Sequence, residues 1–140
     1  MDKRGGRILK GKICEYAIVY MIGSVGYCAI ELLWRGYSHW TMTVTGGVCF
    51  MIIYLTNRMM RSYSVFKKCL VCAVDVTAIE LMVGCIVNVL LGWNVWDYSD
   101  QPFSFMGQIC PGFFALWFLL VLPVIIISDT MQKSIFGDMA

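Results

Sequence analysis

Apolar residues occur along this chain in four runs that are separated by short polar stretches. The runs cover residues 13–33, 40–56, 69–91 and 109–127. A helix needs about 20 apolar residues, within a range of roughly 17 to 25, to cross the hydrocarbon core of a bilayer. The first, third and fourth runs have this length, and the second nearly has it once Trp40 is included. Because a backbone in lipid must satisfy its own hydrogen bonds, the pattern predicts an all-α protein with four transmembrane helices.

The composition agrees with this pattern. Of the 140 residues, 59% are hydrophobic and only 14% are charged, whereas a soluble domain usually carries about 25% charged residues. The termini and loops are too short to bury a core of their own, so residues 1–140 are predicted to form a single membrane domain. The net charge of +2 comes mostly from basic residues that flank the helices, and it does not indicate a nucleic-acid partner.

Basic residues orient the predicted helices. They are concentrated before the first run and between the second and third runs, at Lys3, Arg4, Arg7, Lys10, Lys12, Arg58, Arg61, Lys67 and Lys68. The other two loops carry Arg35 alone. Since basic loops stay in the cytoplasm, both termini are predicted to be cytoplasmic. The same topology gathers four tryptophans at the outer interface, where such rings prefer to lie, namely Trp34, Trp40, Trp93 and Trp96.

The two predicted helical hairpins share a short sequence pattern. WRGYS begins at Trp34 and is followed by Cys49, and WDYS begins at Trp96 and is followed by Cys110. The two tryptophan-to-cysteine spacings differ by a single residue. Two hairpins that enter from the same side would form a parallel repeat about an axis along the membrane normal. The match covers few residues, so a repeat and a chance likeness both stay open.

The third run carries an acidic residue, Glu80, at its centre. An ionised carboxylate at this depth costs about 2.5–3.5 kcal/mol even on lenient insertion scales. With about 100° per residue, Thr77, Glu80, Gly84 and Asn88 share a helix stripe about 80° wide. In one interpretation this stripe binds a proton or a cationic group. In the other, a protonated Glu80 joins neighbouring helices by hydrogen bonds.

Glu31 near the end of the first run and Arg35 just after it form an i,i+4 pair in the favourable order. Trp34 lies beside them, and His39 would extend the row if the helix continued past Gly36. The functional interpretation is a cluster that faces a substrate or relays protons. The structural interpretation is an interfacial anchor, because arginine near an interface often reaches towards the headgroups.

The loop after the third run, WNVWDYSDQPFSF, is aromatic and acidic and has no basic residue. Trp96, Asp97 and Tyr98 lie at its centre. Such a surface suits an organic cation, through charge and through contact with aromatic faces. The same residues also suit a tight turn with aspartate caps ahead of the fourth helix.

Seven cysteines lie within the apolar runs or at their ends, where cysteine behaves as a small hydrophobic residue. Cys69 and Cys72 form one CxxC pair, but no second pair and no histidine accompany it. A zinc site combines more ligands than this pair supplies, so we expect neither a metal nor another cofactor. The chain also has no nucleophile elbow and no P-loop of the form GxxxxGK[ST]. We therefore do not expect an enzyme.

Two longer motifs carry a family resemblance. ELLWRGYSHWTM and NVWDYSDQPFSFMGQICP resemble the putative ABC-transporter type IV (CmpB-like) family of small bacterial membrane proteins. The matching residues are Glu31, Trp34, Arg35, Gly36, Trp96, Asp97, Tyr98, Pro102, Gly107 and Cys110. The resemblance implies a permease-type, multi-pass protein of the bacterial plasma membrane, although the chain is short for an ABC permease. Without a P-loop of its own, it would need a separate ATPase subunit.

Two functional hypotheses follow. In the first, the protein is a transporter or transporter component that moves a small, cationic solute. It would act as a homodimer or a higher homo-oligomer, because four helices enclose little volume. The solute would contact Glu31, Trp34, Arg35, Glu80, Asn88, Trp96, Asp97 and Tyr98. In the second hypothesis, the protein is an accessory subunit whose outer aromatic face binds membrane lipids or a protein partner.

Overall fold

The structure, a computed structural model, describes residues 3–137. This part of the chain forms four α-helices, two of which continue into short π-helical stretches. In chain order the elements are α1 (Lys3–Arg35), α2 (Trp40–Met59), α3 (Val65–Gly84), η1 (Cys85–Leu90), α4 (Pro111–Thr130) and η2 (Met131–Ile135). The only extended pairing within the described residues is an isolated bridge between Phe105 and Ile109. The predicted all-α class is confirmed.

Three helical stretches are long and apolar enough to cross a membrane, namely Gly5–Arg35, Val65–Leu90 and Pro111–Ile135. They support a multi-pass membrane protein. α2 has 20 residues, but it is not among the three stretches. Its first half contains three threonines and two glycines, which lower its hydropathy. α1 also begins well before the predicted residue 13, because a basic segment outside lipid can continue a helix.

Local sequence signals set the boundary between α1 and α2. α1 ends at Arg35, and Gly36 follows with a φ of +75°, a conformation that glycine adopts without steric cost. His39 then caps α2, because its ring nitrogen accepts a hydrogen bond from the Thr41 backbone N–H. The helix therefore does not continue past Gly36, and His39 does not extend the polar row that ends at Arg35.

α1 and α2 pack closely through glycines. A Cβ at Gly23 would collide with Phe50 and with the Gly46 carbonyl, and a Cβ at Gly46 would collide with Tyr27. Small residues let helix backbones approach each other in lipid, where dispersion contacts contribute much of the attraction. The glycines thus fix α1 against α2.

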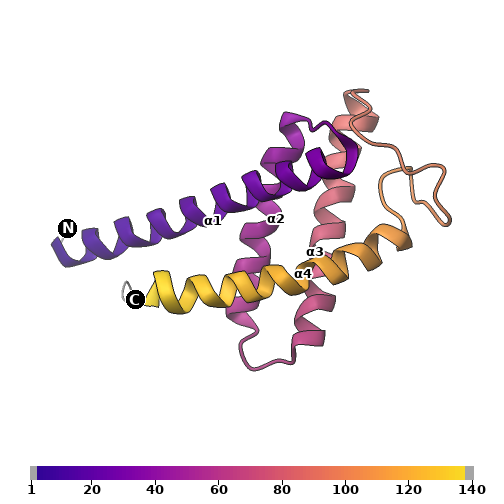
Figure 1. The fold of residues 1–140 in the computed structure, drawn as a ribbon. Coiled ribbons are helices and arrows are strands. Elements are labelled where there is room, and N and C mark those ends of the chain that lie inside the picture. The colour runs from indigo at the N-terminus through magenta and orange to yellow at the C-terminus, as the bar shows by residue number, and fades with distance from the viewer. Residues whose placement is uncertain (1–2, 138–140) are drawn as a thin grey trace.

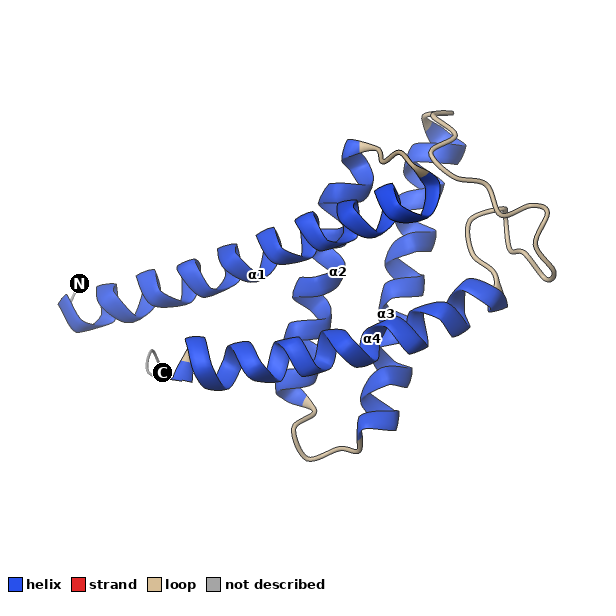
Figure 2. Ribbon diagram, in the orientation of Figure 1, coloured by secondary structure: helices blue, strands red, loops and turns tan. Residues whose placement is uncertain are grey.

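α2 lies at the centre of the bundle and contacts α1, α3 and α4. In Figures 1 and 2, α1 and α4 both cross the pair formed by α2 and α3, and the start of α1 and the end of α4 lie on the same side of the molecule. Within the described residues, the backbones of α1 and α4 do not come into contact. The space between these two helices is therefore bounded by their side chains.

The long segment from residue 91 to residue 110 is fastened to the end of α3 and to η1. Val95 donates its backbone N–H to Asn88 at 2.7 Å, and the Asn88 amide donates to Gln108 at 2.8 Å. Trp96 is buried and donates its indole N–H to the Gln108 backbone carbonyl at 3.1 Å. A Cβ at Gly84 would collide with Gln108 and Trp96, so this glycine lets the segment lie against α3.

Candidate functional site

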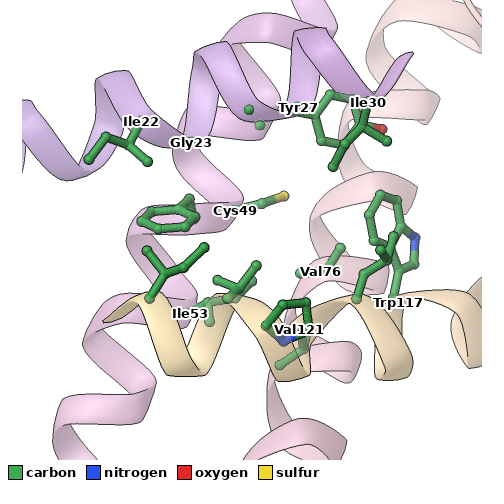
Figure 3. Close-up of a pocket in the computed structure, with 16 residues that line it drawn as sticks. Ile22, Gly23, Tyr27, Ile30, Cys49, Ile53, Val76, Trp117 and Val121 are labelled. Atoms are coloured by element: carbon green, nitrogen blue, oxygen red, sulfur yellow. The ribbon is translucent and has the colours of Figure 1, made fainter. Parts of the chain in front are cut away.

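A cleft lies between α1 and α4, with α2 behind it (Figure 3). It contains two adjoining cavities of about 300 Å³ and about 250 Å³. Tyr27 and Ile30 of α1, together with Trp117 and Leu120 of α4, line both of them. We call the larger one the mid-bundle cavity and the smaller one, which reaches the 91–110 segment, the loop-side cavity.

The mid-bundle cavity has an almost wholly apolar lining. In Figure 3, side chains from all four helices surround it, among them Ile22, Cys49, Ile53, Val76 and Val121. Apolar cavities of this kind accept hydrocarbon or aromatic groups and do not favour a hydrated ion. The cavity is partly open, because α1 and α4 do not close over it.

The rings of Tyr27 and Trp117 stack across the cleft, where the two cavities meet. Their centroids are 5.9 Å apart and their planes differ by 22°. This is the offset arrangement that aromatic pairs prefer. Both rings line both cavities, so a ligand that occupies the whole cleft must pass this pair or displace it.

We call the stacked rings of Tyr27 and Trp117 the aromatic wall of the cleft. Glu80 lies behind it and is only 4% exposed. Its Oε1 accepts a hydrogen bond from the Tyr98 hydroxyl at 3.1 Å, and its Oε2 accepts one from the Trp117 indole N–H at 3.0 Å. No lysine or arginine among residues 5–137 forms an ion pair with it. Glu80 is therefore held by two neutral donors, and both of these donors line the loop-side cavity.

Tyr98 reaches Glu80 because its ring is stacked on Phe113 of α4. The two ring centroids are 4.2 Å apart and the planes differ by 11°, a contact typically worth about 0.5–1.5 kcal/mol beyond area burial. The Glu80 carboxyl group thus joins α3, α4 and the long loop, as the structural interpretation of this residue requires. The same contacts place it one side chain away from the cavity, as the functional interpretation requires.

The predicted ion pair closes the loop end of the cleft. Arg35 Nη2 lies 2.5 Å from Glu31 Oε1, and the Ser38 hydroxyl donates to Glu31 Oε2 at 2.7 Å. Arg35 Nη1 also donates to the Val95 carbonyl at 3.2 Å, which fastens α1 to the long loop. Because the two charges compensate each other, this pair presents little net charge to the cavity.

The structure brings most of the predicted site residues together. Those that line the loop-side cavity are Glu31, Trp34, Arg35, Trp96 and Tyr98. Glu80 stands directly behind Tyr98, to which it is hydrogen bonded. The remaining two, Asn88 and Asp97, do not line either cavity in the cleft.

Asn88 and Asp97 instead organise the long loop. Asn88 bonds Val95 and Gln108, as described above. Asp97 is exposed and accepts hydrogen bonds from the Ser99 hydroxyl at 2.5 Å and from the Ser99 backbone N–H at 2.9 Å. These two hydrogen bonds hold the pKa of Asp97 below its usual value, and the one from the Ser99 hydroxyl has the larger effect. This is the aspartate-capped turn that the structural interpretation of the loop predicted.

Among the aromatic residues of the cleft, sequence reasoning missed Phe113 and Trp117. Trp117 did leave a signal, because it alone brings an indole N–H into the apolar run 109–127, and a buried tryptophan usually needs an acceptor. Glu80 is that acceptor. The pairing could not be assigned from sequence, because it depends on how α3 and α4 are rotated against each other.

The tryptophans expected at one interface have different environments. Trp34 is 76% exposed, whereas Trp96 is 6% exposed. Trp40 and Trp93 are exposed as well, and their rings lie 5.9 Å apart and within 5.8 Å of His39. The two copies of the sequence pattern thus differ in structure, since Trp34 precedes the short connection 36–39 and Trp96 lies within the long segment 91–110.

Neither a nucleotide loop nor a metal centre is found in the part of the chain that the structure describes. GRILKGKI, from Gly6 to Ile13, matches the P-loop pattern except at its last position. It lies inside α1, whereas a P-loop needs a turn whose free backbone N–H groups surround phosphates. No three His, Cys, Asp or Glu side chains among residues 3–137 are placed to share a metal ion.

Comparison with known proteins assigns the chain to a family. No curated protein and no solved structure matches it. A family model described as "Putative ABC-transporter type IV" matches residues 9–139, which include both sequence motifs and every residue that lines the cleft. That description and the three apolar helices are consistent with a membrane transport component. The chain belongs to this family, whose model is described as "Putative ABC-transporter type IV".

Proposed function

We propose that the protein is the membrane-embedded component of a transporter and that it binds a lipophilic organic cation in the cleft between α1 and α4. The observation that carries this proposal is the position of Glu80. This buried acid has no basic partner in the described residues, and it stands directly behind the aromatic wall of a largely apolar cleft.

The cleft supports both parts of such a ligand. Its mid-bundle cavity suits an apolar body, because its lining is aliphatic and aromatic. Tyr27, Trp117 and Tyr98 favour a cationic group through cation–π attraction at the ring faces that are not stacked on a neighbouring ring, and this attraction strengthens when water is excluded. Glu80 adds a negative charge, or a carboxyl group that can lose its proton when the cation arrives, whereas the charge of Glu31 is already balanced by Arg35.

The proposal includes a four-helix topology with both termini in the cytoplasm of a bacterial cell. α2 is about 30 Å long at 1.5 Å per residue, which matches the hydrocarbon thickness. Two of its threonines and both of its glycines face other helices, since Thr41, Thr45, Gly46 and Gly47 are buried. The basic residues at the start of α1 and between α2 and α3 favour a cytoplasmic location for those ends.

A second copy of the chain and a separate ATPase complete the proposed transporter. The cleft is open between α1 and α4, so a homodimer would close it. The chain itself would not be an enzyme, and ATP hydrolysis would occur on the other subunit. Pull-down from native membranes tests this part, because it should recover an ATPase in a defined ratio.

Two ions of similar size and opposite charge test the ligand class. Binding of tetraphenylphosphonium and tetraphenylborate to the purified protein in nanodiscs is measured by equilibrium dialysis, with empty nanodiscs subtracted. We expect specific binding of the cation. Glu80→Gln should weaken it about tenfold, which corresponds to the loss of about 1.4 kcal/mol. Asp100→Asn, an exposed loop acid, is the matched control and should leave binding unchanged.

A variant that fills the cleft separates the cavity from the charge. Gly26 lines the mid-bundle cavity, and a Cβ at this position meets no atom within 4 Å. Gly26→Leu should therefore fold normally and block the cation. Equal binding of both ions, or full binding by Glu80→Gln and Gly26→Leu, would rule out this ligand and this cleft.

The second candidate function, an accessory subunit that binds at its outer face, rests on the exposed rings of Trp40 and Trp93. Large exposed aromatic groups mark lipid interfaces and partner surfaces. In this case a defined partner should co-purify with the protein and be lost in a Trp40→Ala, Trp93→Ala double variant. Glu80→Gln would then have no effect on the association.

A further inference from the structure

A separate pocket lies at the other end of the bundle, where α2 ends, α3 begins and α4 passes into η2. Its volume is about 470 Å³. Four basic side chains line it, namely Arg58, Arg61, Lys68 and Lys133, and one acidic side chain, Asp129. The excess of positive charge is the first observation that points to an anionic ligand.

The partners of these groups leave much of the positive charge uncompensated. Arg58 donates to Glu15 at 3.0 Å, outside the pocket lining. The acid within the pocket, Asp129, accepts a hydrogen bond from the neutral amide of Asn57 at 2.8 Å. Arg61 donates to the neutral side chain of Gln132 at 2.9 Å.

Lys68 is the most unusual member of this group. It is only 7% exposed, and within residues 3–137 it forms no ion pair. Lysine is rarely buried without a partner, because removing an ammonium group from water is costly. A buried, uncompensated lysine that lines a roomy pocket is therefore the second observation that points to an anion.

We propose that this pocket binds the phosphate group of an anionic phospholipid. Pockets of basic residues between transmembrane helices on the cytoplasmic side are suited to such headgroups, and each lysine or arginine adds about 1 kcal/mol. The phosphate oxygens would accept hydrogen bonds from Lys68, Arg61 and Lys133.

The surroundings favour a lipid over a soluble phosphate. Just beyond Lys68, the α3 side chains Val71 and Val74 are exposed and apolar, and Ile126 and Ile127 of α4 are exposed just before Asp129. Acyl chains could lie along these surfaces while the phosphate occupies the pocket. A free phosphate would use the basic side chains alone.

Native mass spectrometry of the purified chain tests the proposal. Phosphatidylglycerol is compared with phosphatidylcholine and diacylglycerol that carry the same acyl chains. We expect retention of the anionic lipid, weakened about fivefold by Lys68→Met or by Lys133→Gln, from the loss of about 1 kcal/mol each. Lys67→Gln is the matched control, because Lys67 is exposed, faces the Tyr63 ring and does not line the pocket.

Further arms distinguish the outcomes. If millimolar inorganic phosphate removes the lipid from the wild type but not from Lys68→Met, free phosphate and the lipid phosphate compete for the same site, as the proposal requires. Displacement by phosphate without any preference for phosphatidylglycerol over phosphatidylcholine would assign the pocket to free phosphate and overturn the lipid. Equal retention of all three lipids, or an equal loss in Lys67→Gln, would also overturn it. Lys133 is exposed, so its variant keeps the test valid even if Lys68→Met fails to fold.

One acid of the chain, Asp138, follows Gly137 of the pocket lining in sequence and lies outside the described residues. Asp138→Asn is therefore included. We expect both the wild-type chain and this variant to retain phosphatidylglycerol. Retention by Asp138→Asn alone would show that the chain's own carboxylate fills the pocket, and the proposal would fail.

Discussion

The indole nitrogen of Trp117 lies 3.0 Å from Oε2 of Glu80, and its N–H thereby connects α4 to the last turns of α3. The same indole ring stacks on Tyr27 of α1, although the backbones of α1 and α4 are not in contact. One side chain thus links the buried acid to the open side of the bundle. The contacts of Trp117 contribute to the stability of the bundle and to the lining of the cleft, and variants can test these two roles separately.

Trp117→Phe should lower the free energy of unfolding by about 1–3 kcal/mol, because it removes a donor from a buried carboxyl group and leaves an aromatic ring in place. Reversible unfolding in mixed micelles measures this change. Trp93→Phe is the control, since Trp93 is exposed and its loss should cost no more than about 0.5 kcal/mol. Equal effects of the two changes would mean that the indole bond does not contribute.

Gly23→Ala and Gly26→Ala, three residues apart on α1, should have opposite effects. A Cβ at Gly23 would collide with Phe50 and the Gly46 carbonyl, whereas at Gly26 it meets nothing within 4 Å. We expect Gly23→Ala to destabilise the protein by about 1–3 kcal/mol. Gly26→Ala should stabilise α1 by up to about 1 kcal/mol through its helix propensity. Thermal unfolding in detergent compares them, and a tolerated Gly23→Ala would contradict the close packing of α1 on α2.

Asn88→Ala should loosen the long loop without unfolding the helices. The Val95 backbone N–H loses its acceptor at 2.7 Å, and Gln108 loses a donor. A loss of about 1 kcal/mol corresponds to amide exchange about fivefold faster at Val95. Hydrogen–deuterium exchange resolves this segment, and Gln101→Ala, an exposed change in the same loop, should leave the rate unaltered. If the exchange rate at Val95 is unchanged in Asn88→Ala, Asn88 does not hold the loop and becomes a candidate ligand contact again.

The turn at Asp97 should depend on pH in the acidic range. The Ser99 hydroxyl and then the Ser99 backbone N–H hold the pKa of Asp97 below its usual value. Because the folded pKa is the lower one, the turn is fully stabilised above the unfolded value of about 3.9 and loses that support as the pH falls through the folded pKa. NMR titration of the Asp97 carboxyl should show a higher pKa in Ser99→Ala. An identical titration in the variant would contradict the bond.

Much of the fold could be predicted from local sequence. The three apolar stretches, the break at Gly36 and the i,i+4 pair of Glu31 and Arg35 are fixed by residues close together in the chain. Helix periodicity alone placed Glu80 and Gly84 on one face, and the structure buries both residues. These features depend on short-range geometry, which a single sequence contains.

The candidate site was only partly predictable, for a reason visible at Asn88 and Trp96. Asn88 belongs to the polar stripe of the third run, yet it bonds the long loop, and Trp96 of that loop is buried, although an exposed interfacial position was expected. Polarity and spacing show that a side chain needs a partner. They do not show which of several donors, distant in the sequence, will meet it.

The sequence by itself determined which four segments form helices and that the chain turns between α1 and α2, because hydrophobic run length, helix period and glycine conformation act within a few residues. Only the tertiary structure decided that Trp117 and Tyr98 bind Glu80, that α1 and α4 remain apart, and that Lys68 lies in a basic pocket. These arrangements depend on the rotation and crossing of helices, which are set by close contacts such as that of Gly23 with Phe50.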